Sequence, residues 1–227
     1  ANDLCVETPE IVGQIFSRVL REIESGALPL LPCTTFAFER APEAFRYMAQ
    51  ARHIGRVVFR HPVGAPRVDQ PVRADATYLV TGGLKGLGLL AAQWLADEGA
   101  RHLVLAGRGA PDTKTRATLD ALAAGGVQVQ CVAADVSTAQ GVAAIMAALT
   151  TGAPPLGGVL HCAGVLDDGV LLRQTPARFA AVIGPKADGA WRLHRAVQQA
   201  GLRPDFFVLY SSMSAVLGSP GQGNYVA

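Results

Sequence analysis

The chain has 227 residues, of which 50% are hydrophobic and 17% are charged. This composition predicts a folded protein with a sizeable core and excludes a disordered chain. The formal net charge of +2 is too balanced to indicate a nucleic acid or an anionic membrane surface as a partner. No apolar run approaches the length of about 18 residues that a membrane span needs. We therefore expect neither a nucleic-acid partner nor a membrane partner.

The N-terminus has neither the basic region nor the apolar region of a signal peptide. The cysteines are far apart in the sequence and lack the spacing of a metal site. They are Cys5, Cys33, Cys131 and Cys162. Reduced cysteines are typical of a cytosolic protein. We therefore expect a cytoplasmic protein without a bound metal.

Residues 1–60 hold a few elements that do not make a complete core by themselves. Apolar residues at helical spacing predict a helix from Ile11 to Leu20. After it, the sequence predicts a proline-rich extended run at 28–32, a short helix at 41–49 and a strand at 56–59. The region therefore predicts a small α+β unit.

Three stretches of this region resemble the C-terminal tail of the medium-chain enoyl reductases of polyketide and fatty acid synthases. They are G-x-L-P-L-L-P at 26–32, A-F-R-Y-M-A at 44–49 and H-I-G-R-V-V at 53–58. The nucleotide-binding half of such a reductase is not among these residues. The resemblance therefore implies an enoyl reductase C-terminal fragment at 1–60 with a structural role, and we assign it no catalytic residue.

Residues 61–74 carry three prolines and no hydrophobic periodicity, which is typical of a linker. From residue 76 onward, short apolar runs alternate with longer helical segments. Strands are predicted at 77–80, 102–106, 127–133, 158–161 and 206–210, and helices at 85–98, 114–124, 138–149 and 176–200. Such alternation implies right-handed crossovers and a parallel sheet that is buried on both faces. We therefore predict an α/β domain at 75–227 with a doubly wound, Rossmann-like parallel sheet.

The stretch TYLVTGGLKGLG at 77–88 is the centre of this prediction. A β-rich run breaks into glycines and a helix follows, which is the context in which a glycine motif indicates dinucleotide binding. Glycine lets the backbone approach a pyrophosphate, and the helix directs free N–H groups at it. The alternative is an ordinary tight turn that binds nothing. The spacing T-G-x-x-x-G-x-G resembles the short-chain dehydrogenase/reductase family, which binds NAD or NADP. The cofactor-binding residues predicted here are Thr81, Gly82, Gly83, Leu84, Gly86, Leu87 and Gly88.

Ligands of a doubly wound sheet bind at the carboxyl ends of the strands. Arg108 follows the second strand, where an arginine can pair with a ribose 2′-phosphate, so we predict NADPH. The alternative is a solvated surface arginine. Asp135 could accept a hydrogen bond from the adenine amino group or cap the next helix, and Val136 beside it joins the predicted cofactor site. Ala163 and Gly164 are small enough for the backbone to lie along the nicotinamide ribose.

Polar side chains suited to acid catalysis occur near the last strand. Tyr225 can act as a general acid toward a carbonyl oxygen if a nearby cation lowers its pKa, and Lys186 is the candidate cation. The hydroxyl of Ser212 can polarise the same carbonyl. Each residue alone has an ordinary alternative: a tyrosine in a core, a lysine on a helix face, a serine in a turn. His161 is expected to be a core histidine.

Several long stretches of residues 76–227 resemble the catalytic half of the ketoreductase domain of polyketide synthases. They are TGGLKGLG, LVLAGRGAP, AADVS, GVLHCAGVLDDGVL, PKADGAWRLH and FFVLYSSMSAVLGSPGQGNYVA. The resemblance implies that Ser212, Tyr225 and Lys186 are the catalytic set. It also implies NADPH-dependent reduction of a β-ketoacyl chain linked to the phosphopantetheine of an acyl carrier protein, in an oxidoreductase that works beside other synthase domains.

The family's stereochemical marker is also present. Leu166-Asp167-Asp168 matches the L-D-D signature of the class that gives the D-configured 3-hydroxyacyl product. The opposite class carries a tryptophan eight residues before the tyrosine, where this chain has Leu217. The resemblance further implies that the domain continues past Tyr225, so we expect an incomplete sheet. The alternative functions are a non-catalytic fragment or scaffold that at most binds NADP(H), and a stand-alone short-chain dehydrogenase.

Overall fold

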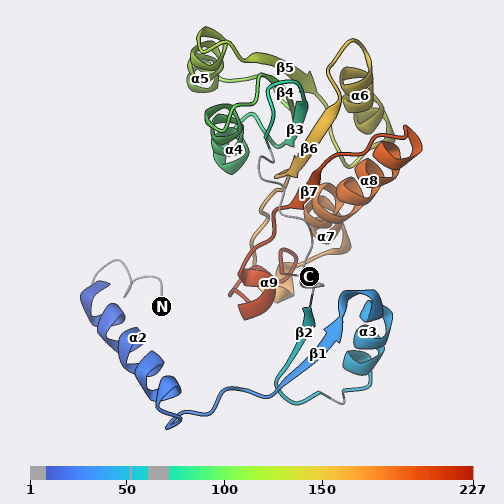
Figure 1. The fold of residues 1–227 in the computed structure, drawn as a ribbon. Coiled ribbons are helices and arrows are strands. Elements are labelled where there is room, and N and C mark those ends of the chain that lie inside the picture. Colours follow the sequence, from blue (N-terminus) through green and yellow to red (C-terminus); the bar gives the residue numbers. More distant parts are fainter. Residues whose placement is uncertain (1–8, 52, 61–71, 227) are drawn as a thin grey trace. The chain divides into compact units, whose positions relative to one another are not determined.

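The computed structural model describes residues 9–51, 53–60 and 72–226. The chain divides into two compact units, Ala1–Arg67 and Val68–Ala227. Figure 1 follows the chain through both units. Most of the predicted linker at 61–74 lies outside the described residues, and so does Cys5.

The first unit holds a helix and a small parallel strand pair. Its elements are α2 (Pro9–Glu24), β1 (Cys33–Ala37), the 3-10 turn η1 (Phe38–Arg40), α3 (Ala41–Ala49) and β2 (Arg56–Arg60). Strands β1 and β2 pair in parallel, and α3 makes the connection between them. The ring of Phe59 on β2 lies 6.1 Å from that of Phe38 and 6.0 Å from that of Phe45. Strand β1 was not predicted, because its sequence CTTFA offers a single large apolar side chain.

The second unit is built on a five-stranded sheet. Its strands are β3 (Thr77–Thr81), β4 (His102–Gly107), β5 (Gln128–Ala133), β6 (Leu156–His161) and β7 (Phe206–Leu209). They are all parallel and lie in the order β5-β4-β3-β6-β7. The chain therefore runs outward from β3 in one direction and then returns to start β6 on its other side. This confirms the predicted doubly wound, Rossmann-like sheet and creates a topological switch point between β3 and β6.

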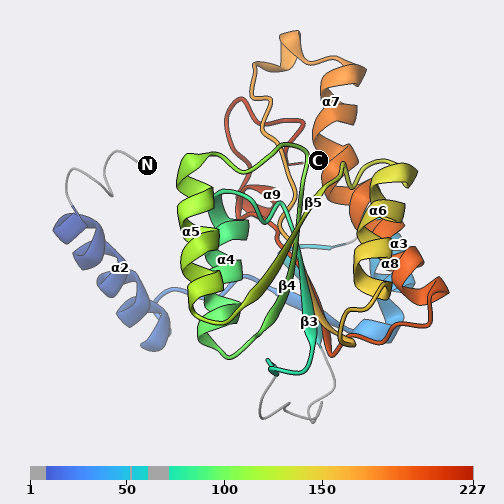
Figure 2. The same ribbon diagram turned by 90° about the horizontal axis from the view of Figure 1, so that it is seen from above.

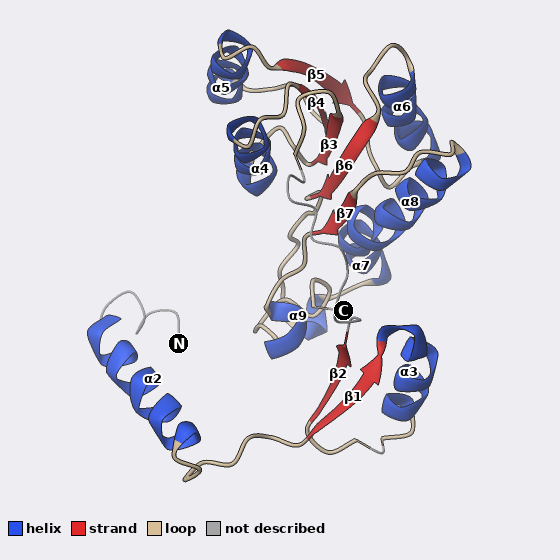
Figure 3. Ribbon diagram, viewed as in Figure 1, coloured by secondary structure: helices blue, strands red, loops and turns tan. Residues whose placement is uncertain are grey.

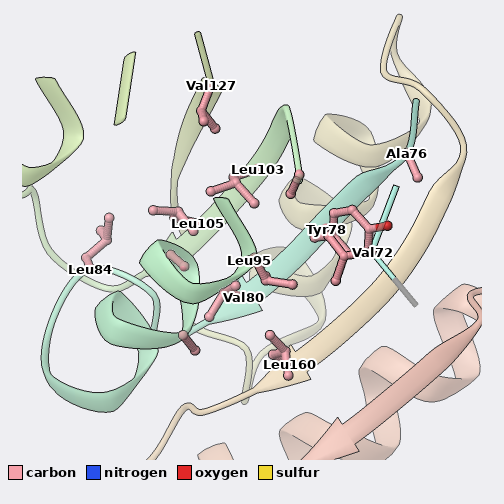
Figure 4. Close-up of a cluster of buried hydrophobic side chains, with 13 residues drawn as sticks. Val72, Ala76, Tyr78, Val80, Leu84, Leu95, Leu103, Leu105, Val127 and Leu160 are labelled. Carbon is pink, nitrogen blue, oxygen red and sulfur yellow. The ribbon is translucent and has the colours of Figure 1, made fainter. Parts of the chain in front are cut away.

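Helices cover both faces of this sheet. They are α4 (Gly86–Asp97) and α5 (Thr113–Ala124) on one face, and α6 (Ala139–Thr150) and α8 (Gly189–Gln199) on the other (Figure 2). Alternate residues of a strand point to opposite faces, so Tyr78 and Val80 pack toward α4 whereas Leu79 packs toward α6. Figure 4 shows the cluster on the α4 side, where Leu95, Leu103 and Leu105 are also buried. The near-continuous apolar strands of the sequence thus correspond to a sheet with two cores.

The helix predicted at 176–200 is not uniform. It consists of α7 (Pro176–Ile183), a π-helical turn η3 (Gly184–Asp188) and α8. Pro185 has no N–H to donate, so regular α-helical bonding cannot pass through it. Two short elements were also not predicted: the 3-10 turn η2 (Leu171–Arg173) and α9 (Ser214–Leu217). Figure 3 shows the loops on either side of α9.

The packing between β6 and β7 can be tested at Gly158. A Cβ at this position would come within 2.2 Å of the ring of Phe206. We expect Gly158→Ala to lower the free energy of unfolding by about 1–3 kcal/mol, because the ring of Phe206 or the strands must move to admit the methyl group. Urea unfolding measures the change. Gly109→Ala, whose new Cβ would meet no atom within 4 Å, is the control, and equal stability of the two variants would contradict the close contact.

Candidate active site

A cavity of about 320 Å³ lies at the carboxyl ends of the strands around the switch point. It is the place where an open α/β sheet binds ligands. Eight of the predicted cofactor-binding residues line it: Thr81, Gly82, Leu84, Arg108, Asp135, Val136, Ala163 and Gly164. The structure therefore gathers the ends of four strands, which are far apart in the sequence, around one space.

A second cavity of about 270 Å³ adjoins the first. The two share four lining residues, Gly82, Lys85, Gly164 and Val165. The second cavity is also lined by two more predicted cofactor-binding residues, Leu87 and Gly88, and by two predicted catalytic residues, Lys186 and Tyr225. The pair of cavities thus has the form of a nucleotide site that continues into a reaction site.

The glycine turn between β3 and α4 keeps these cavities close to the backbone. Gly82 has φ +68°, and a Cβ there would meet the backbone of Ala163 at 3.0 Å. A Cβ on Gly88 would lie 2.2 Å from the carbonyl oxygen of Gly82. Both positions therefore require glycine. Gly82 needs it for its positive φ and for its contact with Ala163, and Gly88 needs it for its contact with Gly82. Gly83 and Gly86, also predicted as cofactor-binding, belong to the same turn but line neither cavity.

The N-terminus of α4 suits an anion. Its N-cap residue Lys85 makes no capping hydrogen bond through its side chain. The first N–H groups of a helix have no partner within the helix, and together with the helix dipole they attract phosphate. Lys85 also lines both cavities. The residues present therefore fit the pyrophosphate of a dinucleotide.

Arg108 and Asp135 stand at neighbouring strand ends on the nucleotide side. Arg108 is exposed and lines the first cavity directly after β4. Asp135 Oδ1 accepts hydrogen bonds from the hydroxyl of Ser137 at 2.6 Å and from its N–H at 2.9 Å. The Ser137 hydroxyl is the main cause that lowers the pKa of Asp135, with a smaller contribution from the charge of Arg108. Asp135 therefore orders the turn that leads to α6, whose N-cap is Thr138.

His161 is buried at the end of β6 and belongs to the fold. Its Nε2 lies 2.9 Å from the carbonyl oxygen of Pro185, and its Nδ1 lies 2.8 Å from Oγ1 of Thr81. A carbonyl only accepts, so Nε2 carries the hydrogen and Nδ1 accepts from the Thr81 hydroxyl. Burial lowers the pKa of His161 and favours its neutral form. Both ring nitrogens are satisfied, which agrees with the expectation of a core histidine.

Lys186 and Tyr225 meet at the second cavity. Lys186 lies on the π-helical turn, and its Nζ donates to the carbonyl oxygen of Tyr210 at 2.9 Å. The same Nζ lies 5.3 Å from the centre of the Tyr225 ring. A Cβ on Gly164 would come within 3.2 Å of the Lys186 side chain, so glycine at this position leaves room for that side chain. A positive charge and a phenol are thus placed together.

Ser212 is not brought to the same place. It does not line the second cavity, and its hydroxyl oxygen accepts a hydrogen bond from the N–H of Ser214 at 3.2 Å. The neighbouring Ser211 does line the cavity.

Sequence reasoning did not identify several lining residues of the second cavity. They are Lys85, Cys162, Val165, Tyr210 and Ser211. All of them lie inside the stretches that carry the ketoreductase resemblance, and that position is the signal that could have identified them. Burial raises the pKa of the Cys162 thiol to about 11, so this thiol is neutral near pH 7.

The described residues contain no group of three or more His, Cys, Asp or Glu side chains that could hold a metal ion. Among the helices in the described ranges, none is long and apolar enough to cross a membrane.

Two family models match the chain. Residues 76–227 match the KR domain, and residues 4–59 match the zinc-binding dehydrogenase family. The second match fits the enoyl reductase tail that the sequence predicts for this region.

The chain is also similar to large curated proteins. Phenolphthiocerol synthesis polyketide synthase type I Pks15/1 of Mycobacterium marinum is 42% identical over the whole chain, which covers 11% of that protein. Mycoketide-CoA synthase of Mycobacterium tuberculosis is 40% identical over the whole chain, which covers 5% of it. Another M. tuberculosis relative, 42% identical and 14% covered, carries the name "Putative inactive phenolphthiocerol synthesis polyketide synthase type I Pks1". The chain therefore spans about a tenth of the length of such relatives.

Solved structures agree with these matches. A structure described as A-type ketoreductases from a modular polyketide synthase has 37% identity and a TM-score of 0.62, over 73% of this chain and 35% of that one. The first ketoreductase of the tylosin polyketide synthase has 34% identity and a TM-score of 0.59, over 72% of this chain and 35% of that one. With the switch-point cavities and the family match over 76–227, these likenesses show that the chain belongs to the KR domain family, the ketoreductases of polyketide synthases.

Proposed function

We propose that residues 75–227 reduce a β-ketoacyl thioester with NADPH to the D-configured 3-hydroxyacyl thioester. The observation that carries this proposal is the meeting of Lys186 and Tyr225 in a cavity that shares Gly82 and Gly164 with the nucleotide cavity. A nicotinamide ring bound across those shared residues would face the phenol.

The roles of the side chains follow from this arrangement. The bound cofactor supplies a hydride for the keto carbon. Tyr225 donates its phenolic proton to the carbonyl oxygen, which becomes the hydroxyl of the product. The positive charge of Lys186 stabilises the tyrosinate that remains. Ser212 holds the carbonyl oxygen, which requires its hydroxyl to turn away from the N–H of Ser214.

Arg108 selects the phosphorylated cofactor in this proposal. Its guanidinium lies at the rim of the nucleotide cavity, where a 2′-phosphate on the adenine ribose would accept paired hydrogen bonds. Asp135 keeps its turn-ordering role and offers its second carboxylate oxygen to the adenine amino group. The stereochemical assignment comes from the L-D-D signature at Leu166-Asp167-Asp168 and from Leu217.

The partners follow from the likeness to polyketide synthases. The substrate is a β-ketoacyl chain on the phosphopantetheine of an acyl carrier protein, and the neighbours are other synthase domains in a cytoplasmic enzyme. Residues 1–60 act as the C-terminal part of an enoyl reductase, and 61–74 as the linker to the ketoreductase domain.

A second candidate is a KR domain without catalytic activity. It is favoured by the name of one relative, which calls that synthase inactive, and by the place of Ser212 outside the second cavity. A stand-alone short-chain dehydrogenase is disfavoured, because residues 4–59 match another reductase family.

Replacing the proposed proton donor tests the function. Tyr225→Phe should lower turnover of a β-ketoacyl thioester by at least about 10²-fold and leave NADPH affinity nearly intact, because only the proton is lost. NADPH absorbance follows turnover, fluorescence titration follows binding, and chiral chromatography identifies the product enantiomer. Unchanged turnover would refute the role of Tyr225, whereas a wild type that binds NADPH without turnover would support the inactive alternative.

The cofactor preference is tested at Arg108. Arg108→Gln should raise the KM for NADPH by about 10–100-fold, since a charge-assisted hydrogen bond contributes about 1.5–3 kcal/mol. The KM for NADH should stay nearly the same. Arg116→Gln, which removes an exposed arginine from α5, is the matched control. If Arg108→Gln changes both cofactors equally, the 2′-phosphate contact is wrong.

The thiol of Cys162 reports on occupancy of the second cavity. Because burial raises its pKa to about 11, alkylation by iodoacetamide should be slow at pH 7 and rise roughly tenfold per pH unit, since the thiolate is the nucleophile. Saturating NADPH should slow this reaction and leave the exposed Cys33 unaffected. Mass spectrometry of the labelled peptides measures both rates. Bound NADPH that gives Cys162 no protection would contradict the proposed place of the nicotinamide.

A further inference from the structure

The segment that carries Tyr225 has little regular structure of its own. After α9 it forms turns, in which the N–H of Tyr225 donates to the carbonyl oxygen of Gln222 at 2.9 Å. A phenol on such a segment needs support from elsewhere if it is to stay beside Lys186.

That support comes from the loop after β6. The N–H of Gly169 donates to the carbonyl oxygen of Gly221 at 2.7 Å. The side-chain amide of Gln222 donates to Asp168 at 3.0 Å, and that of Asn224 donates to the carbonyl oxygen of Asp167 at 2.8 Å. Three consecutive residues of the loop therefore hold three residues of the Tyr225 segment.

Among the residues that bind the loop, Asn224 is the nearest to Tyr225 in the sequence. It directly precedes Tyr225, and 1% of its surface is exposed. A buried side chain with a hydrogen bond to another segment fixes the backbone next to it more firmly than an exposed one does. The direction in which Tyr225 leaves the chain thus depends on the carbonyl group of Asp167.

Two side chains hold the loop itself. The amide of Gln174 donates to the carbonyl oxygen of Gly169 at 3.1 Å, and Arg178 of α7 makes the larger set of bonds. The guanidinium of Arg178 donates to both carboxylate oxygens of Asp167, at 2.8 and 2.5 Å. It also donates to the carbonyl oxygens of Asp167 at 3.1 Å, Asp168 at 2.9 Å and Arg173 at 3.2 Å. A Cβ on Gly169 would lie 2.8 Å from this guanidinium, so the loop closes tightly over it.

This set has more bonds than an ordinary surface ion pair, and the side chains of Arg178 and Asp167 are 26% and 40% exposed. An exposed pair contributes little because both side chains are solvated and mobile. Here the guanidinium lies within hydrogen-bond distance of two carboxylate oxygens and three carbonyl oxygens, and Nη2 shares its two hydrogens among three of them. A lysine ammonium lacks this planar arrangement of donors. Hydrogen bonding to Asp167 raises the pKa of Arg178, and the same bonds lower the pKa of Asp167.

We propose that Arg178 is a positioning residue for Tyr225, acting through Asp167 to Gly169 and the Gly221 to Asn224 segment. It touches neither substrate nor cofactor. The proposal rests on the proposed function in one respect, because it takes Tyr225 as the proton donor. Loss of Arg178 frees the loop, and the phenol then spends less time beside Lys186.

The test replaces Arg178 in the full protein and measures kcat and the Kd for NADPH. Arg178→Gln should lower kcat for the β-ketoacyl thioester at least about tenfold, while the Kd for NADPH stays within about twofold, because the effect falls on the chemical step. Arg178→Lys should give an intermediate kcat, since lysine keeps the positive charge but lacks the planar set of N–H donors of the guanidinium. Arg192→Gln, which removes an exposed charge from α8, is the matched control and should keep the wild-type kcat.

Hydrogen exchange gives a readout that does not depend on activity. In Arg178→Gln the amides of Gly169 and Tyr225 should exchange faster, whereas those in β3 should not. Asp167→Asn keeps the shape of the loop and should show the same two effects to a smaller degree, which preserves the test if Arg178→Gln fails to fold. Unchanged kcat in the folded variants, or unchanged exchange at Tyr225, overturns the positioning role.

The two proposals fail in different ways. If the wild type shows no turnover, the proposed function fails, and the exchange measurements alone decide whether Arg178 orders the Tyr225 segment. If Tyr225→Phe loses turnover and Arg178→Gln keeps it, the function stands and the role of Arg178 is wrong. A parallel loss of NADPH affinity in Arg178→Gln would mean that the residue supports the whole fold, which also overturns the proposal.

Discussion

Two hydrogen bonds of His161, one with Thr81 and one with Pro185, connect the segments that form the candidate site. Thr81 ends β3 and begins the glycine turn, His161 ends β6, and Pro185 stands on the turn that carries Lys186. The hydroxyl of Thr81 also accepts from the N–H of Ala163 at 3.3 Å. The glycine turn, the loop after β6 and the turn that carries Lys186 are therefore joined through buried side chains, where an unpaired polar group would cost about 1–3 kcal/mol.

The π-helical turn extends these contacts to the other side of the site. Pro185 lies in this turn, and its own carbonyl oxygen is the one that His161 uses. At its end, a Cβ on Gly189 would come within 2.9 Å of Val136, so the turn packs directly on the loop after β5. Lys186 is thus set by contacts with two strand ends, which explains how a residue in the middle of a long helical stretch reaches the cavity.

The sequence predicted the sheet well, because its strands are short apolar runs that end in glycines or polar residues. It did not predict β1, whose alternating pattern contains one large apolar side chain, or the π-helical turn, whose geometry depends on packing around Pro185. The cofactor turn was recognisable since glycine spacing reports backbone conformation directly. The contacts of Arg178 were not, because they join a helix to two loops and leave no periodic pattern. The place of Ser212 outside the cavity likewise depends on a local bond to Ser214.

The charge of Lys186 remains available at the second cavity. Within the described ranges no carboxylate lies within salt-bridge distance of it, and its hydrogen-bond partner is a neutral carbonyl. The nearby Cys162 stays a neutral thiol because burial raises its pKa to about 11, so it does not offset the charge either. In a partly buried site an uncompensated ammonium acts strongly on its neighbours. The groups that can use it are the phenol of Tyr225 and any carbonyl oxygen beside it. This charge supports the proposed reduction, because such a reaction places negative charge on oxygen.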